Sequence, residues 1–415
     1  MFLVVAVFNV FSLLYQLYMV RHLTTIEYGI LNSLFSFLMI ISIPSGTLQT
    51  VVTKFVSTYY ANDNHENIKY FLNSFIKKIF FFSLATFLIF FFCSKRISFF
   101  LQIDSPFLVV LLGVITVFSI ILPLTMGGLQ GLQRFGWLGL TMIANGGLKL
   151  VLGILFVSIG FGVTGAMSSL AVSTFASLLI SFLILLSILS KHSSLPLQEN
   201  SNSEINFSEI YKYSYTVTIV ILCFMILTNI DVLLVKHFFN PLEAGYYSIA
   251  QMAGKVILFL PIAITMVMFP KSSELYSQSK ATLHLLKKSL LYVGLMCGMS
   301  ALFCFLFPEL IIKFLSGEEN PECIPLVRIF SVTMVFFALV YTLQFYHLSI
   351  HSSSIIYFLV LLTIIQVVLI CMFHNTLSQV LYIMFGISVL LFLINLYFAF
   401  YREKLNAVTC IDSNS

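Results

Sequence analysis

Residues 21–29 read RHLTTIEYG, and residues 236–245 read KHFFNPLEAG. In both stretches a cation and a histidine precede a glutamate and, two positions later, a glycine. Three further matches follow, ten and five residues apart in each copy: Pro44, Lys54 and Tyr59, then Pro261, Lys271 and Tyr276. A copy shifted by about 215 residues divides the chain into two equivalent halves, an arrangement that many membrane transporters use.

The composition indicates that lipid covers most of the surface. Of 415 residues, 60% are hydrophobic and only 9% are charged, with a mean hydropathy of +1.03. Soluble domains carry about 25% charged residues. In lipid every backbone polar group needs an internal partner, so only helices or closed barrels can span the membrane. The apolar runs last about 20 residues and lack the alternation of barrel strands, which predicts an all-α, polytopic membrane protein.

The apolar runs predict about twelve transmembrane helices, six in each half. We expect them at 1–20, 28–50, 76–93, 106–126, 137–159, 163–190, 213–235, 244–269, 288–307, 326–346, 354–373 and 378–400. An even number per half gives both copies the same orientation, and hence two pseudo-symmetric six-helix bundles.

The domain boundaries follow from these runs and from one polar stretch. We expect bundles at 1–190 and 213–402, a cytoplasmic linker at 191–212 and a cytoplasmic tail at 403–415. Thirteen of the 21 lysines and arginines fall in the even-numbered loops or the tail, and five fall in the odd-numbered loops. The positive-inside rule then places both termini in the cytoplasm. The first run begins at Met1 without a basic n-region, so we read it as a retained helix in the cytoplasmic (inner) membrane.

Several function classes are disfavoured. The net charge of +5 reflects topology, and no basic and aromatic stripe supports nucleic-acid binding. The GxGxxG stretch at 160–165 follows a membrane helix instead of a strand, so we read it as a turn. His347 and His351 lack a third ligand, and we expect them to be interfacial. The sequence has no P-loop, HExxH motif or Ser-His-Asp set, so we predict no metal, no cofactor and no enzymatic activity.

Ionisable residues inside the apolar runs are the leading site candidates, because a charge at a helix centre costs about 2.5–3.5 kcal/mol on insertion scales. Lys149 and Lys255 lie near mid-depth, one in each half. The position that matches Lys255 in the first copy is Leu38, so this charge is specific to the second copy. The alternative is that each lysine snorkels or bonds a carbonyl group.

Asp231 is the only acidic residue within an apolar run, and its counterpart in the first copy is Gln16. A desolvated carboxylate can take up a cation, so we assign Asp231 to ion coupling; a simple pairing at the interface is the alternative. Asn9, Ser12 and Gln16 recur at helical spacing and predict a polar stripe that faces protein or water. Further substrate-binding candidates are Arg21, Lys236, Arg328, Asn9 and Gln16.

Three stretches carry a resemblance to a known family: residues 21–29, residues 127–135 and the segment from Asn229 through Asp231 and Lys236 to Tyr247. They resemble the polysaccharide-biosynthesis flippases, including those for O-antigen and capsule, of the multidrug/oligosaccharidyl-lipid/polysaccharide exporter superfamily. The resemblance implies two six-helix bundles around a central cavity. It implies a polyprenyl-diphosphate-linked glycan as substrate, membrane lipid as surroundings, and a polysaccharide polymerase or ligase as a further partner.

In this interpretation Lys149 and Lys255 offset the charge of the diphosphate from opposite halves. Gly29, Pro44, Gly245 and Pro261 mark places where helices can bend during alternating access. A cation-coupled multidrug exporter on the same fold is the alternative, but it should favour intramembrane acids. A membrane-embedded polymerase or glycosyltransferase would need a longer extramembrane loop than any loop of this chain.

Overall fold

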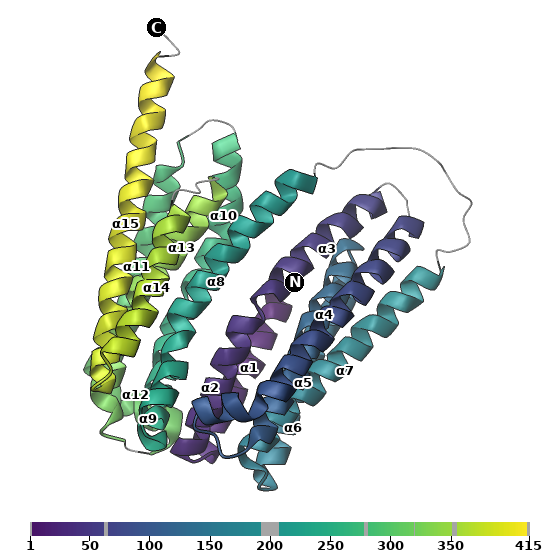
Figure 1. Ribbon diagram of the computed structural model, residues 1–415. Coiled ribbons are helices and arrows are strands. Elements are labelled where there is room, and N and C mark those ends of the chain that lie inside the picture. The colour runs from purple at the N-terminus through teal and green to yellow at the C-terminus, as the bar shows by residue number, and fades with distance from the viewer. Residues whose placement is uncertain are drawn as a thin grey trace. The chain divides into compact units, whose positions relative to one another are not determined.

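The computed structural model describes residues 2–61, 65–191, 207–277, 281–318, 320–350 and 355–412. These residues form α-helices joined by short turns, and no strand occurs among them, which confirms the all-helical membrane fold. The chain divides into two compact units, Met1–Ser214 (unit 1) and Tyr215–Ser415 (unit 2). Figure 1 shows the helices of both units with their labels.

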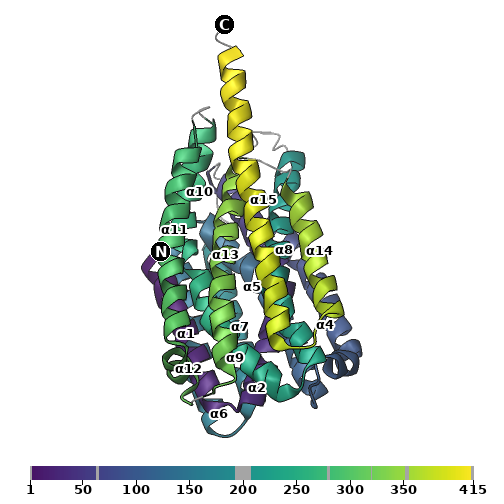
Figure 2. The same cartoon turned by 90° about the vertical axis from the view of Figure 1, so that its left-hand side faces the viewer.

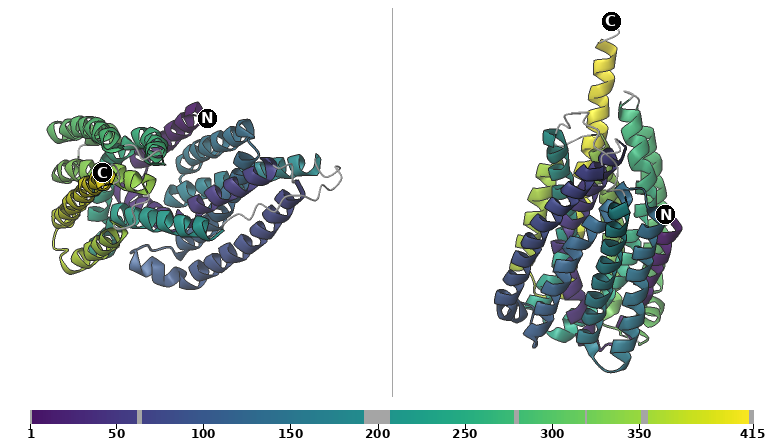
Figure 3. Two further views of the ribbon diagram at one scale, coloured as in Figure 1. Left: turned by 90° about the horizontal axis from the view of Figure 1, so that it is seen from above. Right: turned by 90° about the vertical axis from the view of Figure 1, so that its right-hand side faces the viewer.

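Unit 1 contains seven of the described helices. They are α1 (Phe2–His22), α2 (Thr25–Ile41), α3 (Ile43–Ala61), α4 (His65–Phe100), α5 (Pro106–Gly131), α6 (Phe135–Ser158) and α7 (Gly162–Lys191). The right-hand view of Figure 3 faces this unit and shows its purple and blue helices running alongside one another.

Unit 2 contains most of α8, from Tyr215 on, and the remaining helices. They are α8 (Phe207–Phe238), α9 (Pro241–Phe259), α10 (Pro261–Ser277), α11 (Leu283–Leu306), α12 (Pro308–Ser316), α13 (Cys323–Ser349), α14 (Ile355–Met372) and α15 (Leu377–Asp412). Figure 2 faces this unit and shows α13 between α11 and α15, both of which it contacts. The predicted linker at 191–212 lies mostly outside the described residues, but α8 begins at Phe207, earlier than expected.

The second and eighth predicted helices are each broken into two. The first break falls at Ser42, just before Ile43 and Pro44, and the second falls at Leu260, just before Pro261. A proline has no N–H to donate to the preceding turn and its ring crowds that turn, so a helix bends or ends there. The bend between α2 and α3 is 41°. Helix breaks are therefore present beside Pro44 and Pro261, whereas Gly29 and Gly245 lie in unbroken helix near the starts of α2 and α9.

Ten of the described helices are long and apolar enough to cross a membrane, or eleven if α2 and α3 are counted as one bent span. The α9–α10 pair, which covers the predicted helix at 244–269, is not among them. Its polar side chains, among them Gln251, Lys255 and Lys271, lower the hydropathy of this segment. The number twelve and the pseudo-symmetry therefore stay predictions.

The glutamate of each repeat copy caps a helix. Thr24 accepts a hydrogen bond from the backbone N–H of Glu27, and the Glu27 carboxylate accepts one from the backbone N–H of Thr24. Asn240 and Glu243 form the same reciprocal pair at the start of α9. These capping boxes satisfy backbone donors that the first turn of a helix leaves unpaired. The repeated motif is thus a helix-start signal in both copies.

We predict that Thr24→Ala and Asn240→Ala each lower the free energy of unfolding by about 1 kcal/mol, because each removes one capping acceptor. Thermal unfolding of the purified chain measures this loss. Thr24→Ser, which keeps the hydroxyl, is the control and should unfold close to the wild-type temperature. Equal stability of Thr24→Ala and the wild type would show that the box contributes nothing.

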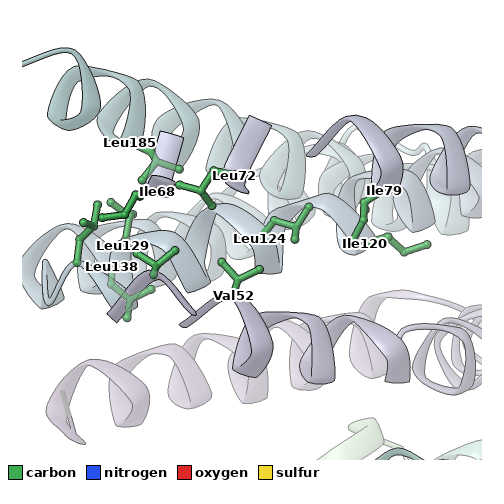
Figure 4. Packing of buried hydrophobic residues seen from close by; sticks show 11 residues of the cluster. Val52, Ile68, Leu72, Ile79, Ile120, Leu124, Leu129, Leu138 and Leu185 are labelled. Carbon is green, nitrogen blue, oxygen red and sulfur yellow. The ribbon is translucent and has the colours of Figure 1, made fainter. Parts of the chain in front are cut away.

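The core of unit 1 lies between α3, α4, α5 and α7. Buried aliphatic side chains from these helices pack together, with Leu138 of α6 at one end (Figure 4). They include Val52, Ile68, Leu72, Ile79, Ile120, Leu124, Leu129 and Leu185. Where α5 meets α3, Gly127 and Gly131 let the two backbones approach: a Cβ at Gly131 would lie 2.9 Å from the carbonyl oxygen of Thr53. Small residues four apart are a common basis for close helix packing in membranes.

Candidate functional site

Lys149 lies on α6 of unit 1 and faces α1. Its Nζ donates a hydrogen bond of 3.1 Å to the Ser12 hydroxyl and lies 5.1 Å from the ring centroid of Tyr15 and 5.8 Å from that of Phe8. Both aromatic faces attract the ammonium group. The side chain is half-buried and therefore partly accessible. The predicted lysine thus contacts one member of the predicted polar stripe, Ser12.

Glycines position Lys149 against α1. Gly139, Gly146 and Gly153 are spaced seven residues apart on α6, and each faces a side chain of α1. A Cβ at Gly153 would lie 2.6 Å from a Tyr15 ring carbon, and one at Gly146 would lie 3.0 Å from Phe8. Tyr15 is fixed further by a 2.8 Å hydrogen bond to the carbonyl oxygen of Ala166 in α7. Close packing of α6 on α1 therefore holds Lys149 between two aromatic rings.

Lys255 lies on α9 of unit 2, about one turn before the break at Leu260. Its Nζ donates a hydrogen bond of 3.0 Å to the Asn229 side-chain oxygen on α8. The amide nitrogen of Asn229 donates in turn to the Met225 carbonyl oxygen and to the Thr228 hydroxyl. Lys255 is half-buried, whereas Asn229 is buried. A neutral side chain thus holds this lysine too.

Asp231 lies two residues after Asn229 on α8 and is completely buried. Its carboxylate accepts a 2.8 Å hydrogen bond from the Tyr247 hydroxyl and a 3.3 Å hydrogen bond from the Gln251 amide. Lys255 lies close enough to interact electrostatically with this carboxylate. An isolated buried charge is unfavourable by several kcal/mol. The two hydrogen-bond donors and the nearby cation therefore stabilise the ionised Asp231 side chain.

In both repeat copies a tyrosine of the helix after the repeated glutamate contacts this position, although Tyr28 follows Glu27 by one residue and Tyr247 follows Glu243 by four. In unit 1, the hydroxyl of Tyr28 on α2 lies 3.5 Å from the Gln16 side-chain oxygen on α1. In unit 2, the Tyr247 hydroxyl of α9 bonds Asp231, the counterpart of Gln16. The first copy has Gln16 and Leu38 where the second has Asp231 and Lys255. The negative and the positive charge are thus both specific to the second copy.

The other predicted substrate-binding residues lie elsewhere in their units. Arg21 and Asn9 are exposed on α1, and Lys236 is fully buried in the last turn of α8. Arg328 is exposed on α13; its Nε donates to the carbonyl oxygen of Phe305 at 3.3 Å, and its guanidinium lies 5.6 Å from that ring centroid. Arg328 therefore packs against the end of α11. The structure gathers Lys149, Ser12 and Tyr15 in unit 1, and Lys255, Asn229 and Asp231 in unit 2.

Sequence reasoning missed Tyr247 and Gln251, although a signal for them exists. Tyr247, Gln251 and Lys255 are spaced four residues apart, which puts three polar side chains on one face of an apolar helix. Asn229 stands two residues before Asp231, and its hydrogen bond to Lys255 was not predicted either. A search for polar residues at helical spacing on the helix after the repeated glutamate would have found both Tyr247 and Gln251.

Two motifs of the sequence prove to be structural. Gly160 and Gly162 adopt positive φ angles of 100° and 51°, and a Cβ at Gly162 would lie 2.5 Å from a Glu27 carboxylate oxygen. This GxGxxG stretch is the turn between α6 and α7, as expected. His347 is buried, with its Nε2 3.0 Å from the Asn395 carbonyl oxygen, whereas His351 lies outside the described residues. Within the described residues no three His, Cys, Asp or Glu side chains form a metal-ligand group.

Comparison with known proteins places the chain in a family. Residues 1–276, which include Lys149, Asp231 and Lys255, match the family described as polysaccharide biosynthesis protein. The chain belongs to this family. The uncharacterized membrane protein MJ1375 of Methanocaldococcus jannaschii is 22% identical over 230 residues, which are 54% of this chain and 54% of that protein. The chain thus matches about half the length of this relative.

Solved structures show the fold of this polysaccharide biosynthesis family member. An inward-facing multidrug resistance MATE family transporter of the MOP superfamily matches with a TM-score of 0.78 at 13% identity, over 97% of this chain and 96% of that one. The lipid II flippase MurJ in an inward closed conformation matches with a TM-score of 0.72 at 13% identity, over 95% and 86%. The chain therefore has the fold of MOP superfamily transporters.

Each unit offers ionisable side chains that can bind a ligand. Among the described residues, each lysine Nζ donates one hydrogen bond, to Ser12 or to Asn229, although an ammonium group has three N–H donors. Each can therefore donate to a further acceptor. Asp231 offers a carboxylate that can accept a proton or a small cation.

Proposed function

We propose that this chain is a flippase that moves a polyprenyl-diphosphate-linked oligosaccharide across the cytoplasmic membrane by alternating access. The glycan and the diphosphate cannot cross hydrocarbon unaided, since polar groups without partners are costly there. Family membership and the fold of MOP superfamily transporters, MurJ among them, support this proposal. We further propose that both termini are cytoplasmic and that a polysaccharide polymerase or ligase uses the glycan after it has crossed.

The observation that carries the proposal is that neutral oxygens, not carboxylates, hold the two lysines directly. Ser12 and Asn229 orient Lys149 and Lys255 without cancelling their charge. In a membrane interior of low dielectric such a charge attracts an anion far more strongly than in water. Hydrogen bonds from ammonium to phosphate oxygens are short and strong. Each unit can thus supply one cation to the diphosphate.

The helix breaks support alternating access. α2–α3 and α9–α10 are interrupted at equivalent positions of the repeat, so each unit has one helix pair whose parts can change their angle without losing further backbone hydrogen bonds. Lys255 stands about one turn from such a break. We propose that bending at the two breaks accompanies the change between inward-open and outward-open states.

We predict that Lys149→Met lowers the rate of translocation at least tenfold, because one hydrogen bond from a charged donor contributes about 1.5–3 kcal/mol. The measurement uses the full chain in proteoliposomes with a polyprenyl-diphosphate-linked disaccharide. Lys149→Arg keeps the charge and should retain most of the rate. Lys95→Met removes the same charge from an exposed position on α4 and should transport like the wild type. Wild-type translocation by Lys149→Met would remove Lys149 from the site.

A cation-coupled multidrug exporter is the second candidate, and the buried Asp231 favours it. A carboxylate with donors from Tyr247 and Gln251 can exchange a proton or sodium ion, and it could drive either a flippase or an exporter. Ethidium efflux from cells that express the chain separates the two candidates. Efflux that Asp231→Asn abolishes, together with no disaccharide translocation in proteoliposomes, would favour the exporter.

A further inference from the structure

A pocket of about 370 Å³ opens in unit 1 between α3 and α4, away from Lys149 and its partners. Tyr59 of α3 forms one wall. The other wall is one face of α4, with Asn67, Tyr70, Phe71, Ser74, Phe75 and Lys78. These positions recur every three or four residues, so they form one stripe along the helix. The proposed flippase function does not use this pocket.

The length of α4 places the pocket near the membrane surface. α4 has 36 residues and therefore spans about 54 Å at 1.5 Å per residue, whereas the hydrocarbon core is about 30 Å thick. Its uncharged stretch, residues 79–94, is bracketed by Lys77 and Lys78 at one end and by Lys95 and Arg96 at the other. The pocket lies on the N-terminal side of Ile79. It is therefore at the level of the lipid headgroups.

The pocket has an apolar floor and a polar rim. The rings of Phe71 and Phe75 stack at 5.1 Å, and the Tyr59 ring lies 6.2 Å from Phe71; all three pack on the core of unit 1. Lys78 and Asn67 are exposed at the rim, and Ser74 is half-buried. The Lys78 ammonium and the Ser74 hydroxyl, one turn apart on α4, are donors for a phosphate group.

The surface next to the pocket suits the chains of a lipid. Directly after Lys78 and Ile79, three phenylalanines of α4 are exposed: Phe80, Phe81 and Phe82, with Phe81 at 69%. A phosphate bound at Lys78 would therefore have an apolar helix surface beside it, in the direction of the hydrocarbon. A free phosphate has no apolar part to pack on such a surface, whereas a phospholipid has its acyl chains.

We propose that this pocket binds the phosphate of an anionic phospholipid, with Lys78 and Ser74, one turn apart on α4, as donors and the acyl chains along the exposed phenylalanines of α4. Basic pockets between transmembrane helices are known to bind lipid headgroups. The proposed orientation of the chain puts this end of α4 on the cytoplasmic side. The lipid would brace α4 against α3, the second half of the bent helix pair.

The repeat provides an internal comparison. The lysine pair at 77–78 has its counterpart at Lys287 and Lys288 in unit 2. There the Lys287 Nζ lies 5.5 Å from the Phe400 ring centroid, and Tyr276, the counterpart of Tyr59, packs into the core of unit 2. Lys288 is an exposed lysine at the position equivalent to Lys78, which makes it a matched control.

The test is a native mass spectrometry titration of the purified full chain with dioleoyl phosphatidylglycerol, and with dioleoyl phosphatidylcholine for comparison. We expect the wild type to bind the first phosphatidylglycerol more tightly than the phosphatidylcholine. Lys78→Gln should weaken phosphatidylglycerol binding about fivefold, Lys78→Arg should preserve it, and Lys288→Gln should leave it unchanged. Ser74→Trp, which fills the pocket without changing charge, should also weaken it. Thermal unfolding of each variant verifies that it is folded.

Three results would overturn the proposal. Equal phosphatidylglycerol affinity in the wild type, Lys78→Gln and Ser74→Trp would show that the pocket holds no lipid. Equal losses in Lys78→Gln and Lys288→Gln would show that only overall charge matters. Displacement of the lipid by millimolar glycerol phosphate would assign the pocket to a free phosphate ester instead of a phospholipid.

Discussion

Lys255→Met is expected to lower both the free energy of unfolding, by about 1–3 kcal/mol, and the translocation rate, at least tenfold. The methionine fills a similar volume but leaves the Asn229 oxygen without its donor and the buried Asp231 without its cation. The measurements are thermal unfolding of the purified chain and translocation of the disaccharide in proteoliposomes. Lys255→Met that unfolds and transports like the wild type would contradict the assigned role.

Combining Lys255→Met with Asp231→Asn separates stability from transport. With both charges removed, the buried cluster is neutral, and we expect the double variant to regain most of the stability that Lys255→Met loses. Groups that interact this closely show coupling energies of about 0.5–3 kcal/mol in double-mutant cycles. Transport should stay low, because the cation for the diphosphate is absent. Strictly additive losses would show that Asp231 and Lys255 act independently.

Gly131→Ala is expected to destabilise the chain by about 1–3 kcal/mol, as overpacking of a close contact does. The added Cβ would lie 2.7 Å from the Val56 Cβ and 2.9 Å from the Thr53 carbonyl oxygen. Neither atom is the end of a flexible side chain, so α5 must move away from α3. The thermal unfolding temperature in detergent measures the effect.

The control for Gly131→Ala is Gly298→Ala in α11, where a Cβ would meet no atom within 4 Å. Alanine is a better helix former than glycine by about 1 kcal/mol, so this change should be neutral or stabilising. Glycine to alanine is thus expected to destabilise the chain at position 131 but not at position 298. A loss at Gly298 as large as that at Gly131 would mean that packing against α3 is not the cause.

The repeat and the helical fold could be predicted from the sequence because both depend on local patterns. Apolar runs of about 20 residues define membrane helices without reference to their neighbours. Pro44 and Pro261 mark the breaks because the missing N–H acts on the preceding turn of the same helix. The capping role of Glu27 and Glu243 was not predicted. The signal was present in the sequence, because Thr24 and Asn240 stand three positions before these glutamates.

The candidate site could be predicted only in part. Lys149, Lys255 and Asp231 stood out because an ionisable residue in an apolar run is rare and costly. Their partners did not: Ser12 is 137 residues from Lys149 in the chain, and Asn229 is 26 residues from Lys255. Arg328 was also a predicted site residue, but it packs on Phe305 of another helix.

The sequence by itself determined that the chain crosses a membrane as helices, that it carries the same motif twice, and where two of its helices break, because hydrophobicity, spacing and proline act within one segment. Only the tertiary structure decided that Lys149 rests between Phe8 and Tyr15, that Asp231 is buried beside Tyr247 and Gln251, and that a pocket opens beside Lys78. These contacts depend on which faces of two helices meet. Glycines such as Gly146 and Gly131 allow this close contact because they have no Cβ. Whether a glycine does so depends on the helix that faces it, which the sequence of one segment does not show.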